Sequence, residues 1–538
     1  MKILLVSITM GALTEELGIC MIASVLKRDF EVDVVSYSVN SIDENAYKEM
    51  QTFEPDAIGI NIYEATRKRV YEVCRILKET LPAVMIFVGG TEAFCNPERI
   101  LNEEDSVDFV VSGEGEITTA ELIQAWQKNG DYYAIDGLSF RDGKNIIINK
   151  PRKLMDDITH LPPPDRSILV KNKIKIASIS TSRGCSGNCS FCITPIMWTN
   201  KKMRWRGLDD EQVLDEIQRL SEQGVLHLFI NDCSYEDPKT DRMLTIAKGL
   251  IERNIKIYYS VDFKPNVYKR LNEQDISLLK QSGLINVFIG IEAGNTSDLK
   301  LYNKGTTVED SQNVMKFFNQ HNINQHFGFI NFNPYSTFDT LRENAQFLTE
   351  NQHLSFGNVF NYATALMLFE TTALYEKVRR DELLLDDYSG LFKYKFCDPK
   401  IQVLAEFMVL TFSDIQRSFG NIVMHDLADK YIDVLSILQK ELSASDHYKD
   451  LLDLIAETKE KAKSDIIKHF HFHEFFNELI ALSENSWNAD KALKIVNSAY
   501  DKKTWLRAIE KIKKDRMLLY KQILMTDSFS RKLLSSLT

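Results

Sequence analysis

The chain has 538 residues, of which 44% are hydrophobic and 26% are charged. This composition is ordinary for globular domains and excludes a mostly disordered, collagenous or disulfide-scaffold chain, while the length suggests roughly three or four domains. The formal charge of −11 disfavours a general nucleic-acid binder, because neutralising phosphates requires clustered Lys and Arg. No apolar run approaches the ~20 residues of a membrane span, and the apolar start lacks a signal-peptide cleavage site, so we expect a cytoplasmic protein.

Residues 1–130 alternate short apolar runs with helical patterns, which predicts a Rossmann-like parallel α/β sheet. Strands are expected at Lys2–Ile8, Val32–Tyr37, Ala57–Ile62, Val84–Val88 and Phe109–Val111, and helices at Ile19–Leu26, Glu44–Thr52, Ala65–Thr80, Pro97–Asn102 and Ile117–Gln127. Glycines follow two of the strands, at Gly89-Gly90 and at Gly113. Because ligands of open α/β sheets bind beside the carboxyl ends of strands, we expect these two turns to face a ligand.

Residues 131–172 are predicted to form a linker that contains a small hairpin near Gly137–Gly143 and a stiff proline-rich segment at Leu161–Arg166.

Residues 173–398 alternate again and predict a partial (β/α)6 barrel, whose chemistry should lie at the carboxyl ends of its strands. Its strands are expected at Ile176–Thr181, Leu226–Ile230, Lys256–Val261, Asn286–Ile291, His326–Phe332 and Asn361–Leu368, with helices between them such as Asp209–Gln223 and Thr307–Gln320.

Residues 399–538 are predicted to form an all-α domain, since residues 400–538 contain no proline and a single glycine. This domain either covers the mouth of the barrel or binds a partner. His469 and His473 stand four residues apart in it and could bind a metal, although the phenylalanines around them favour a helix packing face.

Three cysteines, Cys185, Cys189 and Cys192, fall within eight residues directly after the first expected barrel strand. Thiols stay reduced in the cytosol, so this group predicts a metal site rather than disulfides. Each thiolate at this spacing can hold one iron of a four-iron cluster, which leaves the fourth iron open. Structural zinc is the alternative, but it needs four closed ligands, and nothing pairs with Cys233 or Cys397 as a further donor.

The Cys185–Cys192 motif, with Phe191 before its last cysteine, resembles that of the radical S-adenosylmethionine (SAM) superfamily. Further motifs are similar to the subgroup that carries an N-terminal cobalamin (B12) binding domain, and the resemblance covers about residues 1–385. In the barrel these motifs are Arg204–Arg206, Phe229–Asp232, Gly290–Gly294 and Asn303–Thr306, and in the front domain they are Leu17-Gly18, Pro55–Ile60, Val88–Thr91 and Asp108–Glu116.

The resemblance implies that Cys185, Cys189 and Cys192 hold a [4Fe-4S] cluster and that SAM chelates its open iron. One electron then cleaves SAM to methionine and a 5′-deoxyadenosyl radical, which abstracts a hydrogen atom from the substrate. Four residues are expected to contact SAM: Asp232, Ser260, Glu292 and Asn331. Of these, Glu292 is also expected to be catalytic. Alternatively, Asp232 and Glu292 are structural carboxylates that cap neighbouring segments.

Many B12 domains supply a histidine to cobalt from a DxHxxG motif, but the first histidine of this chain is His160 and the corresponding loop is Ser7–Thr14. Either cobalamin binds without a protein imidazole, or the domain has kept its fold and lost the cofactor. We expect binding, because the glycine turns are present. The cofactor's tail is expected to lie along Gly89, Gly90, Thr91, Gly113 and Glu114.

The loop after the third strand is expected to bring Tyr63 or Arg67 to the lower face of the corrin ring. Alternatively, Arg67–Arg69 is only the solvated first turn of a helix. A cobalt without a strong lower ligand should give up a methyl group more readily to a carbon radical.

The main interpretation is therefore a cobalamin-dependent radical SAM enzyme that methylates an unactivated carbon of a small-molecule or peptide substrate. It would use an external one-electron reductant of the flavodoxin or ferredoxin type, with no nucleic-acid or membrane partner. The alternative enzyme class uses the radical for rearrangement, ring formation or cyclisation, with cobalamin non-methylating or absent.

Two further alternatives are weaker. A transfer-RNA methylthiotransferase needs a second cluster, whereas Cys20 and Cys74 fall inside expected helices, and an iron–sulfur redox sensor needs no barrel cavity.

Overall fold

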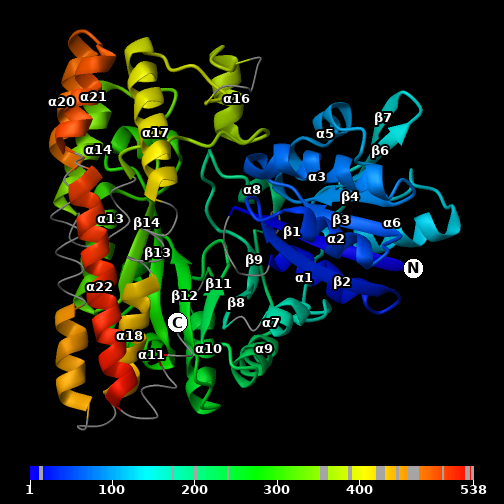
Figure 1. Ribbon diagram of the computed structural model, residues 1–538, viewed down its shortest axis with the longest axis horizontal. Coiled ribbons are helices and arrows are strands. Elements are labelled where there is room, and N and C mark those ends of the chain that lie inside the picture. Colours follow the sequence, from blue (N-terminus) through cyan, green and yellow to red (C-terminus); the bar gives the residue numbers. More distant parts are fainter. Residues whose placement is uncertain are drawn as a thin grey trace. The chain divides into compact units, whose positions relative to one another are not determined.

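The computed structural model (Figure 1) describes the chain except for a set of short segments, and its contacts divide the chain into two compact units. The first unit consists of Met1–Ser186 with Ile193–Cys233, and the second of Gly187–Cys192 with Ser234–Thr538. Among the helices that are described, none has the length and apolarity needed to cross a membrane. The described residues are 1–10, 16–172, 175–198, 204–238, 241–351, 361–385, 391–419, 430–443, 448–458, 472–499, 502–526 and 534.

The first unit contains a seven-stranded sheet with the order β2-β1-β3-β4-β5-β6-β7. Its first five strands are parallel and confirm the five strands expected from the sequence. The hairpin expected in the linker forms β6 and β7, which extend this sheet antiparallel to β5. The strands are β1 Lys2–Thr9, β2 Glu31–Ser38, β3 Ala57–Asn61, β4 Met85–Gly89, β5 Phe109–Val111, β6 Leu138–Asp142 and β7 Asn145–Ile148.

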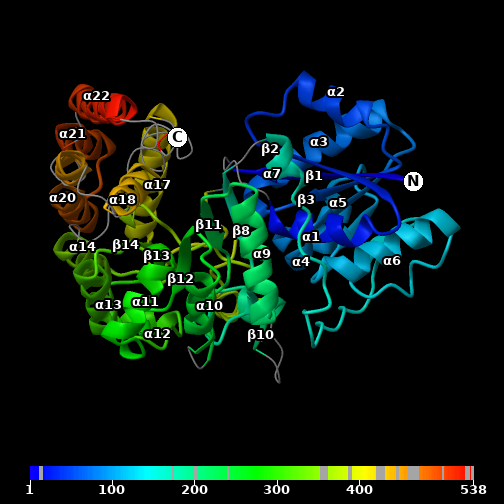
Figure 2. The same cartoon turned by 90° about the horizontal axis from the view of Figure 1, so that it is seen from below.

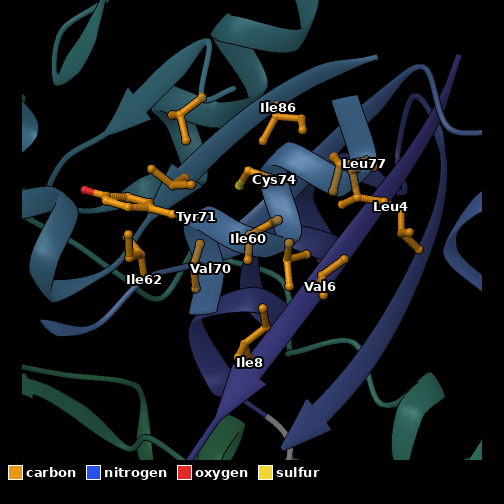
Figure 3. Close-up of a cluster of buried hydrophobic side chains, with 14 of the residues drawn as sticks. Leu4, Val6, Ile8, Ile60, Ile62, Val70, Tyr71, Cys74, Leu77 and Ile86 are labelled. Carbon is orange, nitrogen blue, oxygen red and sulfur yellow. The ribbon is translucent and has the colours of Figure 1, made fainter. Parts of the chain in front are cut away.

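Helices cover both faces of this sheet, with α2 and α3 on one face and α1 and α6 on the other (Figure 2). Helix α3 turns Val70, Cys74 and Leu77 toward the sheet, because residues three and four apart share one face of a helix (Figure 3). They pack on alternate residues of the strands, such as Leu4, Val6, Ile8 and Ile60. The helices of this part are α1 Leu17–Leu26, α2 Glu44–Thr52, η1 Glu64–Thr66, α3 Arg67–Thr80, α4 Thr91–Cys95, α5 Pro97–Glu103, α6 Gly115–Lys128 and α7 Ser167–Asn172.

Two further strand pairs complete the first unit. Strands β8 (Ile176–Ile179) and β11 (His227–Ile230) are parallel, and helix α9 (Asp210–Glu222) stands between them in the chain. A short antiparallel ribbon joins β9 (Ser182–Gly184) to β10 (Trp205–Gly207) and ends directly before Cys185. Gly184 has φ +88°, and a Cβ there would lie 2.3 Å from the carbonyl oxygen of Arg204, so the ribbon requires glycine at this position. Helix α8 covers Thr194–Met197.

The second unit holds three parallel strands, β12 (Tyr258–Phe263), β13 (Leu284–Glu292) and β14 (Asn324–Phe329). The alternation of strands and helices expected for a barrel is confirmed for five strands. The sixth expected strand, over residues 361–368, is wrong: Ala365 makes only an isolated bridge to Phe332. Pro334 follows two residues later and has no N–H to donate, so a longer ladder cannot form there. The helices are α10 Asp241–Glu252, η2 Val267–Lys269, α11 Glu273–Ser282, α12 Thr296–Leu301, α13 Val308–Gln320, α14 Phe338–Glu350 and α16 Ala373–Arg380.

The described residues after 399 are helical, as expected, with their helices drawn from yellow to red in Figure 1. Helix α18 packs against the amino-terminal ends of the strands, where Ile437 joins Tyr258 and Ile285 in one buried cluster. Helix α20 lies beyond the carboxyl end of β14, since Phe476 packs edge-on against Phe332. His469 lies outside the described residues. The helices are α17 Pro399–Phe419, α18 Lys430–Leu442, α20 Phe472–Asn485, α21 Ala489–Ala499 and α22 Lys502–Thr526.

Candidate active site

A cavity of about 600 Å³ lies within the first unit and has mainly apolar walls. One part of its wall follows the carboxyl ends of the parallel strands, near the point where the strand order reverses between β1 and β3. Another part comes from the segments around β8, β9 and β11. Residues of the first part include Asn61, Tyr63, Gly89, Gly90, Thr91 and Gly113, and residues of the second include Ile179, Ser180, Ser182, Arg183, Asn231 and Cys233.

The cavity has an apolar part that is lined by the sheet and by helices α1 and α6. Its residues are Leu5, Phe87 and Val111 from the sheet, Met21 and Ile22 from α1, and Thr119 from α6. Gly59 also lines the cavity, and a Cβ there would lie 2.4 Å from the ring of Phe87, so glycine at this position leaves room for that ring.

Five of the seven residues expected to contact cobalamin line this cavity: Tyr63, Gly89, Gly90, Thr91 and Gly113. Gly90 has φ +114°, and a Cβ there would lie 2.9 Å from the carbonyl oxygen of Ile62. Its backbone conformation and its surroundings therefore both require glycine.

Tyr63 donates a hydrogen bond of 2.7 Å to Glu16 Oε2, and both residues line the cavity. Burial raises the pKa of the Glu16 carboxyl, while the hydrogen bond from Tyr63 opposes that shift. Residues 11–14 of the loop in the place of DxHxxG lie outside the described residues.

Arg67 and Glu114, the other two expected cobalamin contacts, have different partners. The Arg67 guanidinium lies 3.1 Å from Glu92 and 3.5 Å from Glu103, and Arg67 is not among the residues that line the cavity. These two ion pairs also argue against the alternative interpretation, in which Arg67 belongs to a solvated first turn of the helix.

Glu114 is buried, and both of its carboxylate oxygens are used. Oε1 accepts hydrogen bonds of 2.8 Å from Arg183 and from Arg206, and Oε2 accepts one of 2.8 Å from the Met155 amide. Glu114 therefore holds together three segments of the chain.

Arg183 and Trp198 are cavity residues that the sequence interpretation missed. Arg183 pairs with Glu114 and Glu116, and its guanidinium carbon lies 5.6 Å from the centre of the Trp198 ring. The visible signals were a charged residue two places before Cys185 and the acidic Glu114 and Glu116 of the front-domain motif. Nothing in the sequence indicated that these residues pair.

The cysteine motif crosses the boundary of the units as defined above, with Cys185 in the first and Cys189 and Cys192 in the second. In the second unit, residues 188–192 are fixed by a turn that follows α12. Ser190 N donates to Tyr302 O over 2.8 Å, Asn303 Nδ2 donates to Asn188 O over 2.8 Å, and the Phe191 ring packs edge-on against Tyr302 at 5.4 Å. The aromatic residue of the motif thus anchors the loop that carries two of the cysteines.

None of the eight cysteines, all of which lie in the described chain, is in a disulfide. Cys20 and Cys74 are buried in helices, as expected. In the part of the chain that is described, no three His, Cys, Asp or Glu side chains gather as ligands of a single ion would. Cluster ligands each bind a different iron, so this finding concerns sites such as zinc and leaves cluster ligation a prediction.

Asp232 has the structural role that the sequence left open as an alternative. Its buried carboxylate accepts hydrogen bonds from the backbone of Thr181 at 2.7 Å and of Ser182 at 3.0 Å, and from the hydroxyls of both. These contacts fix the turn between β8 and β9. Burial raises the pKa of Asp232, and the four donors oppose that rise.

Three further residues expected to contact SAM lie in the second unit. Glu292 ends β13, and Asn331 follows β14, as expected for residues at carboxyl ends. Asn331 Nδ2 donates to Tyr362 O over 2.8 Å, while its buried Oδ1 has no partner within the described chain. Ser260 is buried in the middle of β12, because this strand runs on to Phe263, two residues beyond the expected end.

Two family models match this chain: the B12 binding domain over residues 3–123 and the radical SAM superfamily over residues 179–348. An uncharacterized methyltransferase of Pyrococcus horikoshii is 27% identical over 314 residues, which are 57% of this chain and 67% of that protein. An anaerobic magnesium-protoporphyrin IX monomethyl ester cyclase of Cereibacter sphaeroides is 25% identical over 372 residues. These are 66% of this chain but only 58% of the cyclase, less than two thirds of its length.

A solved structure has a similar fold over the whole chain. The cobalamin-dependent S-adenosylmethionine radical enzyme OxsB, with aqua-cobalamin and S-adenosylmethionine bound, superposes with a TM-score of 0.63. The match covers 100% of this chain and 83% of OxsB at 20% sequence identity. At that identity the likeness concerns the fold, which agrees with the α/β, barrel and helical parts described above.

Proposed function

We propose, from the premise that this chain belongs to the radical SAM enzymes with an N-terminal B12 binding domain, that it is a cobalamin-dependent methylating enzyme. It would cleave SAM with a [4Fe-4S] cluster and methylate an unactivated carbon of a small-molecule or peptide substrate. One observation carries this proposal: a single cavity is lined by Gly89, Gly90 and Thr91 of the B12-binding match and by Ser180 and Arg183 of the radical SAM match.

The donor set of this cavity fits cobalamin. Gly89, Gly90 and Gly113 line it without side chains, which would let the nucleotide tail approach the backbone, and its apolar part, lined by the sheet, α1 and α6, would take the base of that tail. The first 159 residues contain no histidine, so no imidazole from this domain can reach cobalt. Tyr63, oriented by its hydrogen bond to Glu16, is the residue that we assign to the lower face of the corrin.

The remaining residues fit the cluster and SAM. Cys185, Cys189 and Cys192 would hold the cluster, and three thiolates leave one iron for SAM. We assign the unpartnered Oδ1 of Asn331 to the ammonium or hydroxyl groups of SAM, since a buried acceptor without a partner needs an explanation. Glu292, whose Oε1 already accepts a hydrogen bond from Lys304, is assigned to the same groups. When bound, the cluster with SAM supplies a radical and cobalamin supplies a methyl carrier, while the chain positions and shields them.

Methylation is the reaction that we favour, because the Pyrococcus relative is described as a methyltransferase. The cyclase relative keeps radical rearrangement, ring formation or cyclisation as the second candidate. We also propose a small one-electron donor protein as reductant and a cytoplasmic location, where the thiols stay reduced.

Oxygen-free purification followed by reconstitution tests this proposal. We expect about four irons per chain, as one four-iron cluster requires, together with one corrinoid. With reductant and methyl-labelled SAM, 5′-deoxyadenosine and labelled product should both form. Formation of 5′-deoxyadenosine without methylated product would instead support the second candidate, and an iron content near eight would indicate two clusters.

The cysteine assignment has a matched control within the chain. Cys189→Ala should lose the cluster and the cleavage of SAM, whereas Cys397→Ala, an exposed cysteine outside the motif, should retain both. If Cys189→Ala retains reductive cleavage of SAM, the proposal fails.

A further inference from the structure

Four buried charges in the first unit join the B12-binding segment to the strand that precedes Cys185. Glu114 Oε1 lies 2.8 Å from Arg183 Nη1 and 2.8 Å from Arg206 Nη1. Arg183 also pairs with Glu116. Two carboxylates thus balance two guanidinium groups, and the side chains of all four residues are at least 86% buried. Paired buried charges of this kind tolerate little displacement, because a separated partner would remain desolvated.

Arg183 stands on β9, two residues before Cys185, and this strand is held from several directions. Asp232 binds the backbone of Thr181 and Ser182. Strand β10 pairs with Ser182–Gly184. The pairs of Arg183 with Glu114 and Glu116 tie β9 to the turn after β5 and to the start of α6, and hence to the B12-binding segment.

The same group of charges forms part of the cavity wall. Glu116 and Arg183 both line the cavity, and so does Trp198, over which the Arg183 guanidinium lies. A corrinoid in this cavity would therefore press on side chains that also fix the strand before Cys185. A single residue, Arg183, thus both lines the cavity and belongs to the strand that leads to Cys185.

We propose that Arg183 is a positioning residue that couples occupancy of the corrinoid cavity to the placement of Cys185. Glu114 and Glu116 hold its guanidinium, Trp198 covers it, and the backbone of β9 carries the constraint to the first cluster cysteine. This inference rests on the proposed function, because it requires that the cavity binds a corrinoid and that Cys185 binds the cluster.

The test compares reconstituted protein with and without hydroxocobalamin, which is diamagnetic. The readout is the Mössbauer spectrum of the oxidised cluster with SAM bound. In the unmodified chain we expect the spectrum to change when the corrinoid is added. In Arg183→Gln that change should disappear while the iron content is kept, and in Arg183→Lys, which retains the charge, part of it should return.

Glu92→Gln is the matched control. Glu92 is also a buried carboxylate that binds two arginines, Arg67 and Arg99, but it is not among the residues that line the cavity, and neither of these arginines belongs to β9. This variant should keep the corrinoid-dependent change. If Arg183→Gln does not fold, Glu116→Gln takes its place in the test, because it leaves the Glu114–Arg183 pair intact. In Glu116→Gln the corrinoid-dependent change of the spectrum should be weaker than in the unmodified chain.

A second readout is the ratio of 5′-deoxyadenosine to methylated product. Displacing reacting groups by about 1 Å costs on the order of 100-fold in rate, so in Arg183→Gln this ratio should rise by at least about tenfold. The inference is overturned if Arg183→Gln keeps the corrinoid-dependent change of the spectrum and the product ratio of the unmodified chain, or if Glu92→Gln loses that change to the same extent. If the unmodified chain binds no cluster or no corrinoid, the proposed function itself fails, and the two failures are thereby distinguished.

Discussion

Lys304 Nζ lies 2.9 Å from Glu292 Oε1, and this pair stands over the glycines of two neighbouring strands. A Cβ at Gly290 would meet Lys304 Nζ at 2.7 Å, and one at Gly328 would meet Glu292 Oε2 at 3.3 Å. Glu292 itself has φ +69°, a conformation that costs a non-glycine residue about 1–3 kcal/mol. A strained, oriented carboxylate at the carboxyl end of β13 is the arrangement expected of a ligand-binding residue.

Glu292→Gln should weaken the binding of SAM to the reconstituted protein by about 10- to 100-fold. The reason is that a hydrogen bond to a charged group contributes about 1.5–3 kcal/mol. Isothermal titration calorimetry measures this change. Glu376→Gln, which removes an exposed carboxylate paired with Arg379, is the control and should leave SAM affinity unchanged. Unchanged affinity in Glu292→Gln together with a lower melting temperature would support the structural alternative for this carboxylate.

Gly90→Ala should destabilise the protein by about 1–3 kcal/mol, the usual cost of a non-glycine residue in a sparsely populated backbone conformation. It should also reduce the corrinoid retained after gel filtration, since the new Cβ would lie 2.9 Å from the carbonyl oxygen of Ile62, beside the cavity. Gly143→Ala provides the comparison, because Gly143 has φ +58° but open space around it and stands in the turn between β6 and β7. Equal corrinoid contents in both variants would contradict the assignment of the Gly89-Gly90 turn.

Acidification should destabilise the chain through His227. Burial lowers the pKa of this β11 histidine to about 4. In the unfolded chain its pKa is about 6.5, so between these values the unfolded state binds more protons. Stability is therefore complete above pH ~6.5 and falls as the pH drops through this window, by about 3 kcal/mol for this residue.

Urea denaturation at several pH values measures this dependence. His227→Gln removes the titrating group and should flatten the curve between pH ~4 and ~6.5. If the variant and the unmodified chain lose stability in parallel over this range, His227 is not the responsible group.

Ile437→Ala should lower the free energy of unfolding by about 2–5 kcal/mol, because it leaves a cavity between α18 and the buried residues Tyr258 and Ile285. The cluster lies at the amino-terminal ends of the strands, so the iron and corrinoid contents of the folded protein should not change. Thermal denaturation with metal analysis checks both statements. Leu410→Ala, at an exposed position of α17, should leave the melting temperature unchanged. A loss of cofactors from folded Ile437→Ala would show that α18 does influence the site.

The sequence predicted most strands and helices of this chain, because hydrophobic periodicity is a local property. The alternating core of β1 and the stripe of Val70, Cys74 and Leu77 on α3 follow directly from it. The sixth barrel strand was wrong for a reason that also lies in the sequence, at Pro334. The cluster cysteines and the glycine turns were visible as well, since each occupies a short motif.

The tertiary structure decided which side chains meet. Glu114 and Arg183 are separated by 69 residues, and no local pattern shows that they share a buried ion pair. The same holds for Asp232, which was assigned to SAM but binds the turn at Thr181, 51 residues away. Spacing within a segment determines its helices, strands and ligand motifs, whereas the pairing of charges depends on long-range packing, which brings distant segments together only in the folded chain.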